Sequence, residues 1–406
     1  MLDTMKLAAQ MGAVAEHLQN EAIASQNRLQ RVLEVYAAAC ANPQPWISRQ
    51  DSDPKHLWFN PAIPMEDLST KISIQPLETG HVAIATDGSQ ITPNHHEVAY
   101  CSLVNVGRIA IDYSGQRLPL LDSTPQVFYR SEDLNHGRPA GVGVETILAL
   151  RRTQAEMEEL TALALDWHRK SCPAIALADG ALIHWGLDSL PSDYHQQWMD
   201  PLLKCYDQLR KKRIPIVGYI SSSRSGEMMN FLRLGLCPFE TCECNVHCSE
   251  GTLRNAPCTP DKTKQAKSKT KGLARSLGDA VLWSQLLEPG QRSPLWRSQV
   301  KLLETYGRHR VYFCYLNVGQ EIARVEFPEW VAQDNDLLRL ALEGVLMQVR
   351  RGMGYPVVLA EAHHLAVVRG GDRQRFFALL QREMERVGLP GRTVSLKEAS
   401  KRAGFA

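Results

Sequence analysis

Hydrophobic residues recur along this chain at two spacings, one typical of helices and one typical of strands. Apolar side chains stand three or four positions apart over residues 3–41, which predicts a long amphipathic helix or a pair of helices. The pattern ends at Asn42-Pro43. Residues 42–80 are punctuated by proline and are interpreted as a connector. The N-terminal part is therefore expected to be helical.

Strand-like segments begin after this connector. They lie at residues 81–86, 98–106 and 108–113. A turn is expected at residues 105–107, where Gly107 separates the last two segments. Three antiparallel strands fit this order best, and residues 126–130 are a candidate for a further strand.

From residue 139 onward, helix and strand patterns alternate. A period of 3.6 residues over 139–168 predicts one long helix, and a nearly continuous apolar run at 174–183 predicts a strand covered on both faces. Further helices are predicted at 198–213, 226–236, 277–287, 336–351 and 372–387, and further strands at 214–222, 311–318, 321–327 and 356–360. This alternation indicates an α/β sheet.

The alternation is interrupted at residues 237–275, where a cysteine-rich stretch precedes a lysine-rich one. We interpret this segment as an insertion. The chain then divides into an N-terminal helical arm and connector at 1–79, a main domain at 80–390 and a C-terminal tail at 391–406.

Composition adds few constraints. The 406 residues are 44% hydrophobic and 22% charged, as in an ordinary globular protein, which excludes disordered and small disulfide-stapled classes. A formal net charge of +2 means that any nucleic-acid partner must be bound by a local basic patch. Because we find no secretory signal and no apolar stretch of about 18 residues, we expect a cytoplasmic protein with reduced cysteines and no membrane association.

Two Asp-Gly steps are the first candidates for chemistry. Asp87-Gly88 and Asp179-Gly180 each follow an apolar strand. Ligands bind at strand ends in α/β sheets, and carboxylates there suit a hard divalent cation such as Mg²⁺ or Mn²⁺. A single Asp-Gly step is more often a simple turn, but its repetition after a second strand favours a site.

Acidic and imidazole side chains elsewhere would complete such a site. The helix predicted at 139–168 carries Glu156 and Glu159 on one face, and Glu156 is our candidate ligand. The alternative for Glu156 is a surface ion pair with Arg152, four residues earlier. His363 follows the last apolar segment and is interpreted as a metal ligand or proton carrier, with a buried structural histidine as the alternative.

The inserted cysteines form a second candidate metal site. Their spacing is C-x4-C-x-C-x3-C-x9-C. Such a density of thiolates suggests structural Zn²⁺ or, as a weaker candidate, an iron–sulfur cluster. Reduced or redox-active thiols are the alternative, since paired CxxC steps are missing. The residues are Cys237, Cys242, Cys244, Cys248 and Cys258.

Arg224 and a lysine-rich segment are candidate contacts to nucleic acid. Arg224 follows the strand predicted at 214–222 and would bind a phosphate, or would be an ordinary cation at a helix start. The lysine-rich part of the insertion would give salt-dependent binding without sequence preference, unless it is only a solvated loop. Its lysines are Lys262, Lys264, Lys267, Lys269 and Lys271.

Taken in order, these motifs resemble the NurA family of DNA nucleases. The resemblance runs from about residue 80 to about residue 385. It is carried by the segments IATDGSQ, a helical Glu before ALADGAL, GYISSSRS, GDAVLWSQLLEPGQRS, VYFCYLNVGQEIARVEFP and YPVVLAEAHHLA. The second Asp-Gly step continues with alanine where the family often has serine, which keeps the carboxylate and loses only a hydroxyl.

The resemblance implies a ribonuclease H-like mixed sheet flanked by helices, to which this chain adds the N-terminal helical extension and the cysteine-rich insertion. It also implies a Mn²⁺-dependent (or Mg²⁺-dependent) deoxyribonuclease, exonuclease or single-strand endonuclease, that acts on DNA ends and single strands in double-strand break end resection by two-metal hydrolysis. By position, the catalytic and metal-binding residues would be Asp87, Glu156, Asp179 and His363, with Glu159 as the alternative to Glu156.

The resemblance further implies partnership with a HerA-type hexameric ATPase, and we expect a homodimer. The rival hypothesis is a catalytically degenerate ribonuclease H-like module that binds DNA or serves as a scaffold for the ATPase. The retained carboxylates argue for the enzyme. A phosphotransferase is disfavoured because we find no G-x-x-x-x-G-K-[ST] loop.

The cysteine cluster generates a direct prediction. Protein purified without chelator should contain zinc or iron by elemental analysis, because clustered thiolates retain these metals. Cys248→Ser should lower the metal content, and Cys40→Ser, outside the cluster, is the matched control. Wild-type protein with neither zinc nor iron would rule out the metal site.

Overall fold

The computed structural model describes residues 3–50, 57–78, 80–94, 97, 99–130, 132, 139, 141–237, 239, 242, 244 and 277–389. Most of the predicted insertion at 237–275 and all of the predicted tail at 391–406 lie outside the described residues. The chain forms two compact units. Unit 1 comprises Met1–Ile74, Ile220–Lys301 and Val311–Val325, and unit 2 comprises Gln75–Tyr219, Leu302–Arg310 and Glu326–Ala406.

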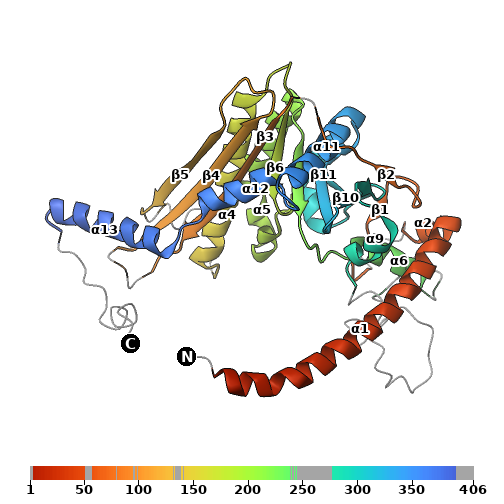
Figure 1. Cartoon of the computed structure of the whole chain (residues 1–406). Helices are drawn as coiled ribbons and strands as arrows, with labels where there is room; N and C mark the ends of the chain where they lie inside the picture. The colour runs from red at the N-terminus through yellow and green to blue at the C-terminus, as the bar shows by residue number, and fades with distance from the viewer. Residues whose placement is uncertain are drawn as a thin grey trace. The chain divides into compact units, whose positions relative to one another are not determined.

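A mixed sheet forms the centre of unit 2 (Figure 1). Its strands are β3 (Val82–Ile91), β4 (Ser102–Asp112), β5 (Leu120–Phe128), β6 (Ala174–Asp179) and β7 (Ile216–Ile220), of which the last residue is assigned to unit 1. They lie in the order β7-β6-β3-β4-β5. β4 is antiparallel to β3 and β5, whereas β6 is parallel to β3 and β7. The predicted α/β sheet is therefore confirmed.

The turn predicted at 105–107 is wrong. β4 continues through these residues and pairs Gly107 with Asp87 of β3 and with Ser123 of β5. A Cβ atom on Gly107 would collide with the backbone oxygen of Ala362 and would lie 2.5 Å from the backbone nitrogen of Ala366. Gly107 therefore lies where a helix crosses the strand closely. Glycine within a strand often marks such a close approach of another backbone.

Two helices cover opposite faces of this sheet, and both pack on β3 and β4. They are α4 (Val144–Trp167) and α12 (Val357–Ala366). Successive strand residues point to opposite faces. Asp87 contacts His363 of α12, whereas the next residue, Gly88, faces Glu156 of α4. The two helices thus approach the same stretch of β3 from its two sides.

The strand predicted at 356–360 is also wrong, because residues 357–360 form the first turn of α12. The buried residues of α12 are Val358, Leu359, Ala362 and Ala366, which recur at helical spacing. A short apolar run does not distinguish a buried strand from a buried helix. Packing against β3 and β4 is what favours the helix here.

The other helices predicted in unit 2 are present. They are α5 (His195–Lys212), α11 (Asn335–Arg351) and α13 (Gly370–Arg386). The structure adds short helices that were not predicted: η2 (Trp185–Ser189), η3 (Ser192–Tyr194), η4 (Lys301–His309, whose first residue is assigned to unit 1) and α10 (Glu329–Ala332). α5 packs against α4. Within the described ranges, none of the helices is long and apolar enough to span a bilayer.

Unit 1 combines mostly short strands with a hydrophobic cluster. Its strands are β1 (Ile63–Pro64), β2 (Ile72–Ser73), β8 (Gln291–Arg292), β9 (Trp296–Arg297), β10 (Val311–Asn317) and β11 (Ile322–Pro328), the last of which belongs to unit 1 through Val325. Its helices are α1 (Thr4–Ala41), α2 (Gln44–Gln50), α6 (Glu227–Gly235) and α9 (Asp279–Leu286). The predicted N-terminal helix is therefore one helix, and its second half contributes Val32 and Tyr36 to the cluster.

A buried aspartate joins α6, α9 and β10 in unit 1. The Asp279 carboxylate accepts hydrogen bonds from the backbone nitrogens of Met228 (3.0 Å) and Met229 (2.9 Å) and from the Tyr315 hydroxyl (2.7 Å). Burial raises the pKa of Asp279 to about 6. Because its hydrogen bonds go to the start of α6 and to β10, we regard Asp279 as a structural residue.

The close crossing at Gly107 gives a test of the fold. Gly107→Ala should destabilise the protein by about 1–3 kcal/mol, because the added methyl group forces α12 away from β4. Gly371→Ala in α13 is the matched control, since no atom lies within 4 Å of its Cβ position, and it should be neutral or slightly stabilising. Urea denaturation measures both. Equal stabilities for the two variants would contradict the packing.

Candidate active site

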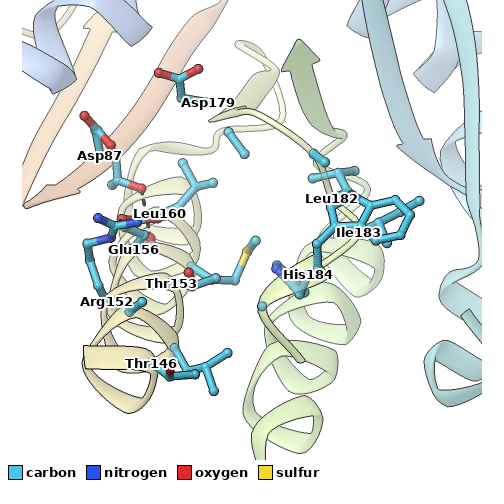
Figure 2. Close-up of a pocket in the computed structure, with 18 of the residues that line it drawn as sticks. Asp87, Thr146, Arg152, Thr153, Glu156, Leu160, Asp179, Leu182, Ile183 and His184 are labelled. Atoms are coloured by element: carbon cyan, nitrogen blue, oxygen red, sulfur yellow. Dashed lines mark hydrogen bonds and ion pairs between the residues drawn. The ribbon is translucent and has the colours of Figure 1, made fainter. Parts of the chain in front are cut away.

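Carboxylates from two strands and one helix line a single pocket in unit 2 (Figure 2). In the parallel pairing of β3 with β6, Thr86 lies opposite Ala178, so Asp87 and Asp179 follow at the same level of neighbouring strands. Glu156 comes from α4. The pocket has a volume of about 500 Å³.

Asp87 lies inside β3 and not at its end, which corrects the expectation from the sequence. The continuously buried part of the strand ends one residue earlier, at Thr86. The Thr86 hydroxyl donates a hydrogen bond of 2.8 Å to the backbone oxygen of Glu156 and so fastens α4 to the strand at this level.

Glu156 is close enough to both aspartates to be influenced by their charges. Burial raises the pKa of Glu156 to about 7, with a further increase from the charges of Asp87 and Asp179, while Arg152 opposes the shift. The Nε atom of Arg152 lies 3.2 Å from the Glu156 carboxylate. The ion pair considered as an alternative is therefore present, and it is formed on the wall of the pocket.

Gly88 makes room for this pair of side chains. A Cβ atom at Gly88 would collide with Oε1 of Glu156 and would lie 2.6 Å from Cγ of Arg152. The glycine of the first Asp-Gly step therefore allows α4 to lie against β3. Close approach, and not a turn, is its role.

The alternative ligand Glu159 is directed elsewhere. Its Oε2 accepts a hydrogen bond of 2.9 Å from Arg108 of β4, which also binds Asp122. Glu159 is not among the residues that line the pocket. Of the two glutamates left open by the sequence, Glu156 is the one beside Asp87 and Asp179.

Asp179 ends β6, and its partner comes from a distant segment. The Tyr355 hydroxyl donates a 2.8 Å hydrogen bond to Oδ1 of Asp179. Partial desolvation and then the charge of Asp87 raise the pKa of Asp179, although the Tyr355 hydrogen bond lowers it. Gly180 follows with a φ of +102°, a conformation that favours glycine and turns the chain sharply out of the strand.

His363 approaches Asp87 from α12, on the face of the sheet opposite Glu156, and it is not among the residues that line the pocket. Its Nδ1 atom lies 2.7 Å from Oδ2 of Asp87. The C-terminal end of α12 is fixed to the sheet, because the Ser89 hydroxyl and the Asn105 amide both donate hydrogen bonds to the backbone oxygen of Ala366. These contacts satisfy a helix-end carbonyl and hold His363 over β3.

The chemistry of this donor set fits a hard divalent cation. Oxygen ligands with an imidazole suit Mg²⁺ or Mn²⁺. Burial is the main cause of the raised pKa values of Glu156 and Asp179, and the charges of neighbouring carboxylates add a repulsion that a cation would relieve. Among the residues that the structure describes, no group of three or more His, Cys, Asp or Glu side chains is already arranged to hold a metal ion. Instead, Arg152, Tyr355 and His363 each hold one of the carboxylates.

Of the other predicted site residues, those that the structure describes are not among the residues that line this pocket. Arg224 is an exposed residue of unit 1. Cys242 is buried in the hydrophobic cluster of unit 1, Cys237 packs against that cluster, and Cys244 is buried. The remaining predicted residues, Cys248, Cys258, Lys262, Lys264, Lys267, Lys269 and Lys271, lie outside the described residues.

Several residues around the carboxylates were given no role from the sequence. Tyr355 opens the segment YPVVLAEAHHLA but was not singled out, although its hydroxyl binds Asp179. His184 and Trp185 follow Asp179 by five and six residues, and an aromatic residue so soon after a candidate metal ligand was a signal that could have been used. Arg152 was considered only as the partner of Glu156.

Comparison with known proteins gives a consistent result. The family model of the NurA domain matches residues 81–368. The crystal structure of the NurA nuclease from Sulfolobus solfataricus is similar, with a TM-score of 0.51 and 13% identity over 95% of this chain and 98% of that chain. A second crystal structure of NurA matches with a TM-score of 0.38 and 10% identity over 87% and 96% of the two chains. A search of curated proteins finds no match. The first structural likeness supports the mixed, helix-flanked sheet expected from the sequence.

The clustering of the carboxylates can be tested by titration. In protein without metal, Glu156 should titrate near pH 7, and Asp87→Asn should lower its pKa, because the substitution removes one of the negative charges that raise it. Carboxyl resonances followed by NMR over pH 4 to 9 measure the shift. Asp166→Asn, at an exposed position near the end of α4, is the control and should leave Glu156 unchanged. An unchanged pKa in Asp87→Asn would mean that the two side chains are apart.

Proposed function

This chain belongs to the NurA family, whose domain model spans residues 81–368, and we propose that it is a metal-dependent nuclease that hydrolyses DNA. The observation that carries the proposal is the convergence of Asp87, Asp179 and Glu156 on one pocket. Phosphodiester hydrolysis needs a place where negative charge on the phosphate is neutralised, and clustered carboxylates are the usual means of holding the cations that do this.

We assign the binding of Mn²⁺ or Mg²⁺ to Asp87, Glu156, Asp179 and His363. When bound, a pair of such cations neutralises the phosphate and lowers the pKa of the attacking water. The protein's own contribution is orientation. Tyr355 fixes one oxygen of Asp179, and His363 fixes one oxygen of Asp87. Metal binding would free Arg152 from Glu156, which leaves its guanidinium on the pocket wall to bind the phosphate.

The wider role is proposed from family membership. We propose that the protein acts on DNA ends and single strands during double-strand break end resection, as a homodimer and together with a HerA-type hexameric ATPase. Arg224 and the lysines from Lys262 to Lys271 are the proposed DNA contacts outside the pocket, and their contribution would weaken with salt. The proposed structural zinc or iron–sulfur site at the inserted cysteines belongs to the same set of proposals.

The decisive experiment uses single- and double-stranded DNA labelled at the 5′ or 3′ end, incubated with Mn²⁺ or Mg²⁺. Asp87→Ala should lower cleavage by about a thousandfold or more, because loss of a metal ligand removes several kcal/mol of transition-state stabilisation. DNA binding and thermal stability should change little. The label positions report the direction of digestion and the balance of exonuclease and endonuclease activity.

Asp166→Ala is the matched control, since Asp166 is exposed and pairs with Arg117 away from the pocket. It should cleave as the wild type does. Undiminished cleavage by Asp87→Ala would refute the site. Tight association with the ATPase together with no metal-dependent cleavage by the wild type would instead favour the degenerate scaffold.

A further inference from the structure

The pocket continues beyond the carboxylates along α4. The residues of α4 that face it include Thr146, Thr153 and Glu156, which share one side of the helix (Figure 2). At a rise of 1.5 Å per residue, the ten steps from Thr146 to Glu156 cover about 15 Å. Residues 181–186 and Ser189 form the facing wall. The space therefore extends from a charged end to a part lined by apolar and hydroxyl side chains.

Trp185 is the aromatic residue of this facing wall. The residue is 48% exposed, although tryptophan is usually largely buried. Its indole therefore contributes little to the hydrophobic core. Trp185 opens η2, five residues after Gly180. An indole held half in water beside a candidate catalytic centre is available to a ligand.

The backbone that carries Trp185 is firmly held. The Trp185 nitrogen donates a 2.9 Å hydrogen bond to the oxygen of Ile183. The preceding side chain, His184, is buried and stacks on both Tyr206 and Tyr306. On the other side, Gly186 approaches Leu150 of α4 so closely that a Cβ atom would lie 3.2 Å from the leucine methyl group. Trp185 is thus presented on a rigid segment.

We propose that this part of the pocket holds the base of the nucleotide that adjoins the scissile phosphate, and that Trp185 stacks on that base. The inference rests on the proposed nuclease function, because the phosphate must lie at the carboxylates for its base to reach the neighbouring wall. Trp185 is then a positioning residue for the reaction. The hydroxyls of Thr146 and Thr153 are the polar groups of α4 that face the base.

The chemistry of a nucleotide matches the two ends of the pocket. Its anionic phosphate suits the cation-binding end, and its flat apolar base suits an indole face, which accepts every base because each has a π-face. A volume of about 500 Å³ is within the range of small-molecule sites. A base inside a duplex is stacked between its neighbours and cannot enter such a pocket. Stacking on Trp185 therefore requires an unpaired nucleotide at the point of cleavage.

The test combines a change in the protein with a change in the substrate. The substrates are two single-stranded oligonucleotides, one natural and one with an abasic residue beside a mapped cleavage position. Single-turnover cleavage in Mn²⁺ is measured for the wild type, Trp185→Ala and Trp185→Phe. Tyr129→Ala removes an aromatic residue that is 63% exposed and does not line the pocket, and it serves as the control.

For the wild type, the abasic residue should slow cleavage by about 5- to 150-fold, the range that corresponds to the stacking of one base on an aromatic side chain. Trp185→Ala should slow cleavage of the natural strand by a similar factor and should lose little more on the abasic strand, because both changes remove the same contact. Trp185→Phe should recover most of the rate. Tyr129→Ala should behave as the wild type does.

Two results would overturn the proposal: an unchanged rate for Trp185→Ala, or losses that multiply when the two changes are combined. A binding measurement that does not depend on cleavage tests the base pocket separately from the nuclease function. In the Asp87→Asn background, fluorescence anisotropy with a labelled tetranucleotide should show weaker binding of the abasic strand, and this difference should vanish with Trp185→Ala. If no variant cleaves DNA, the nuclease proposal fails, and the anisotropy result alone decides whether the base pocket exists.

Discussion

The parallel pairing of β3 with β6 is the constraint on which the rest of the site depends. Thr86 lies opposite Ala178, so the pairing sets Asp87 and Asp179 at one level. Each aspartate follows a buried apolar run, and neither can shift without disturbing the centre of the sheet. The fold therefore holds like charges near one another before any ligand is present, which is a cost that a bound cation would remove.

Two glycines allow the flanking helices to complete this arrangement. Gly88 faces α4, where a side chain would displace Glu156 and Arg152, and Gly107 faces α12, where a side chain would strike the helix backbone. With both helices close to the strands, Glu156 and His363 reach Asp87 from opposite faces of the sheet. The acidic side chains thus come together because the two glycines let both helices lie close to the strands, and not only because acidic residues are present in the sequence.

The carboxylates alone would suit many hydrolytic reactions. The other side chains that line the pocket indicate which class of substrate would fit. Arg152 lies on the wall beside Glu156, and Trp185 lies on a segment braced by His184 and its two tyrosines. Positive charge, hydroxyl groups and an exposed indole within one pocket match the parts of a nucleotide. Family membership and the side chains of this pocket are the observations from which a nucleic-acid substrate is proposed.

The sequence by itself determined most helices and strands of the fold and two aspartates of the candidate site. Long periodic segments such as α4 and the apolar run before Asp179 are specified locally, because their own residues set the type of element. Their extent is set less well, since the strand predicted at 174–183 ends at Asp179. Only the tertiary structure decided that residues 357–366 form a helix, that β4 passes through Gly107, and that Glu156 rather than Glu159 lies at the pocket. Each of these depends on what packs against the segment, for instance on Arg108, which binds Glu159 from another strand. Local pattern cannot contain such information, because the partner lies far away in the chain and is brought close only by the fold.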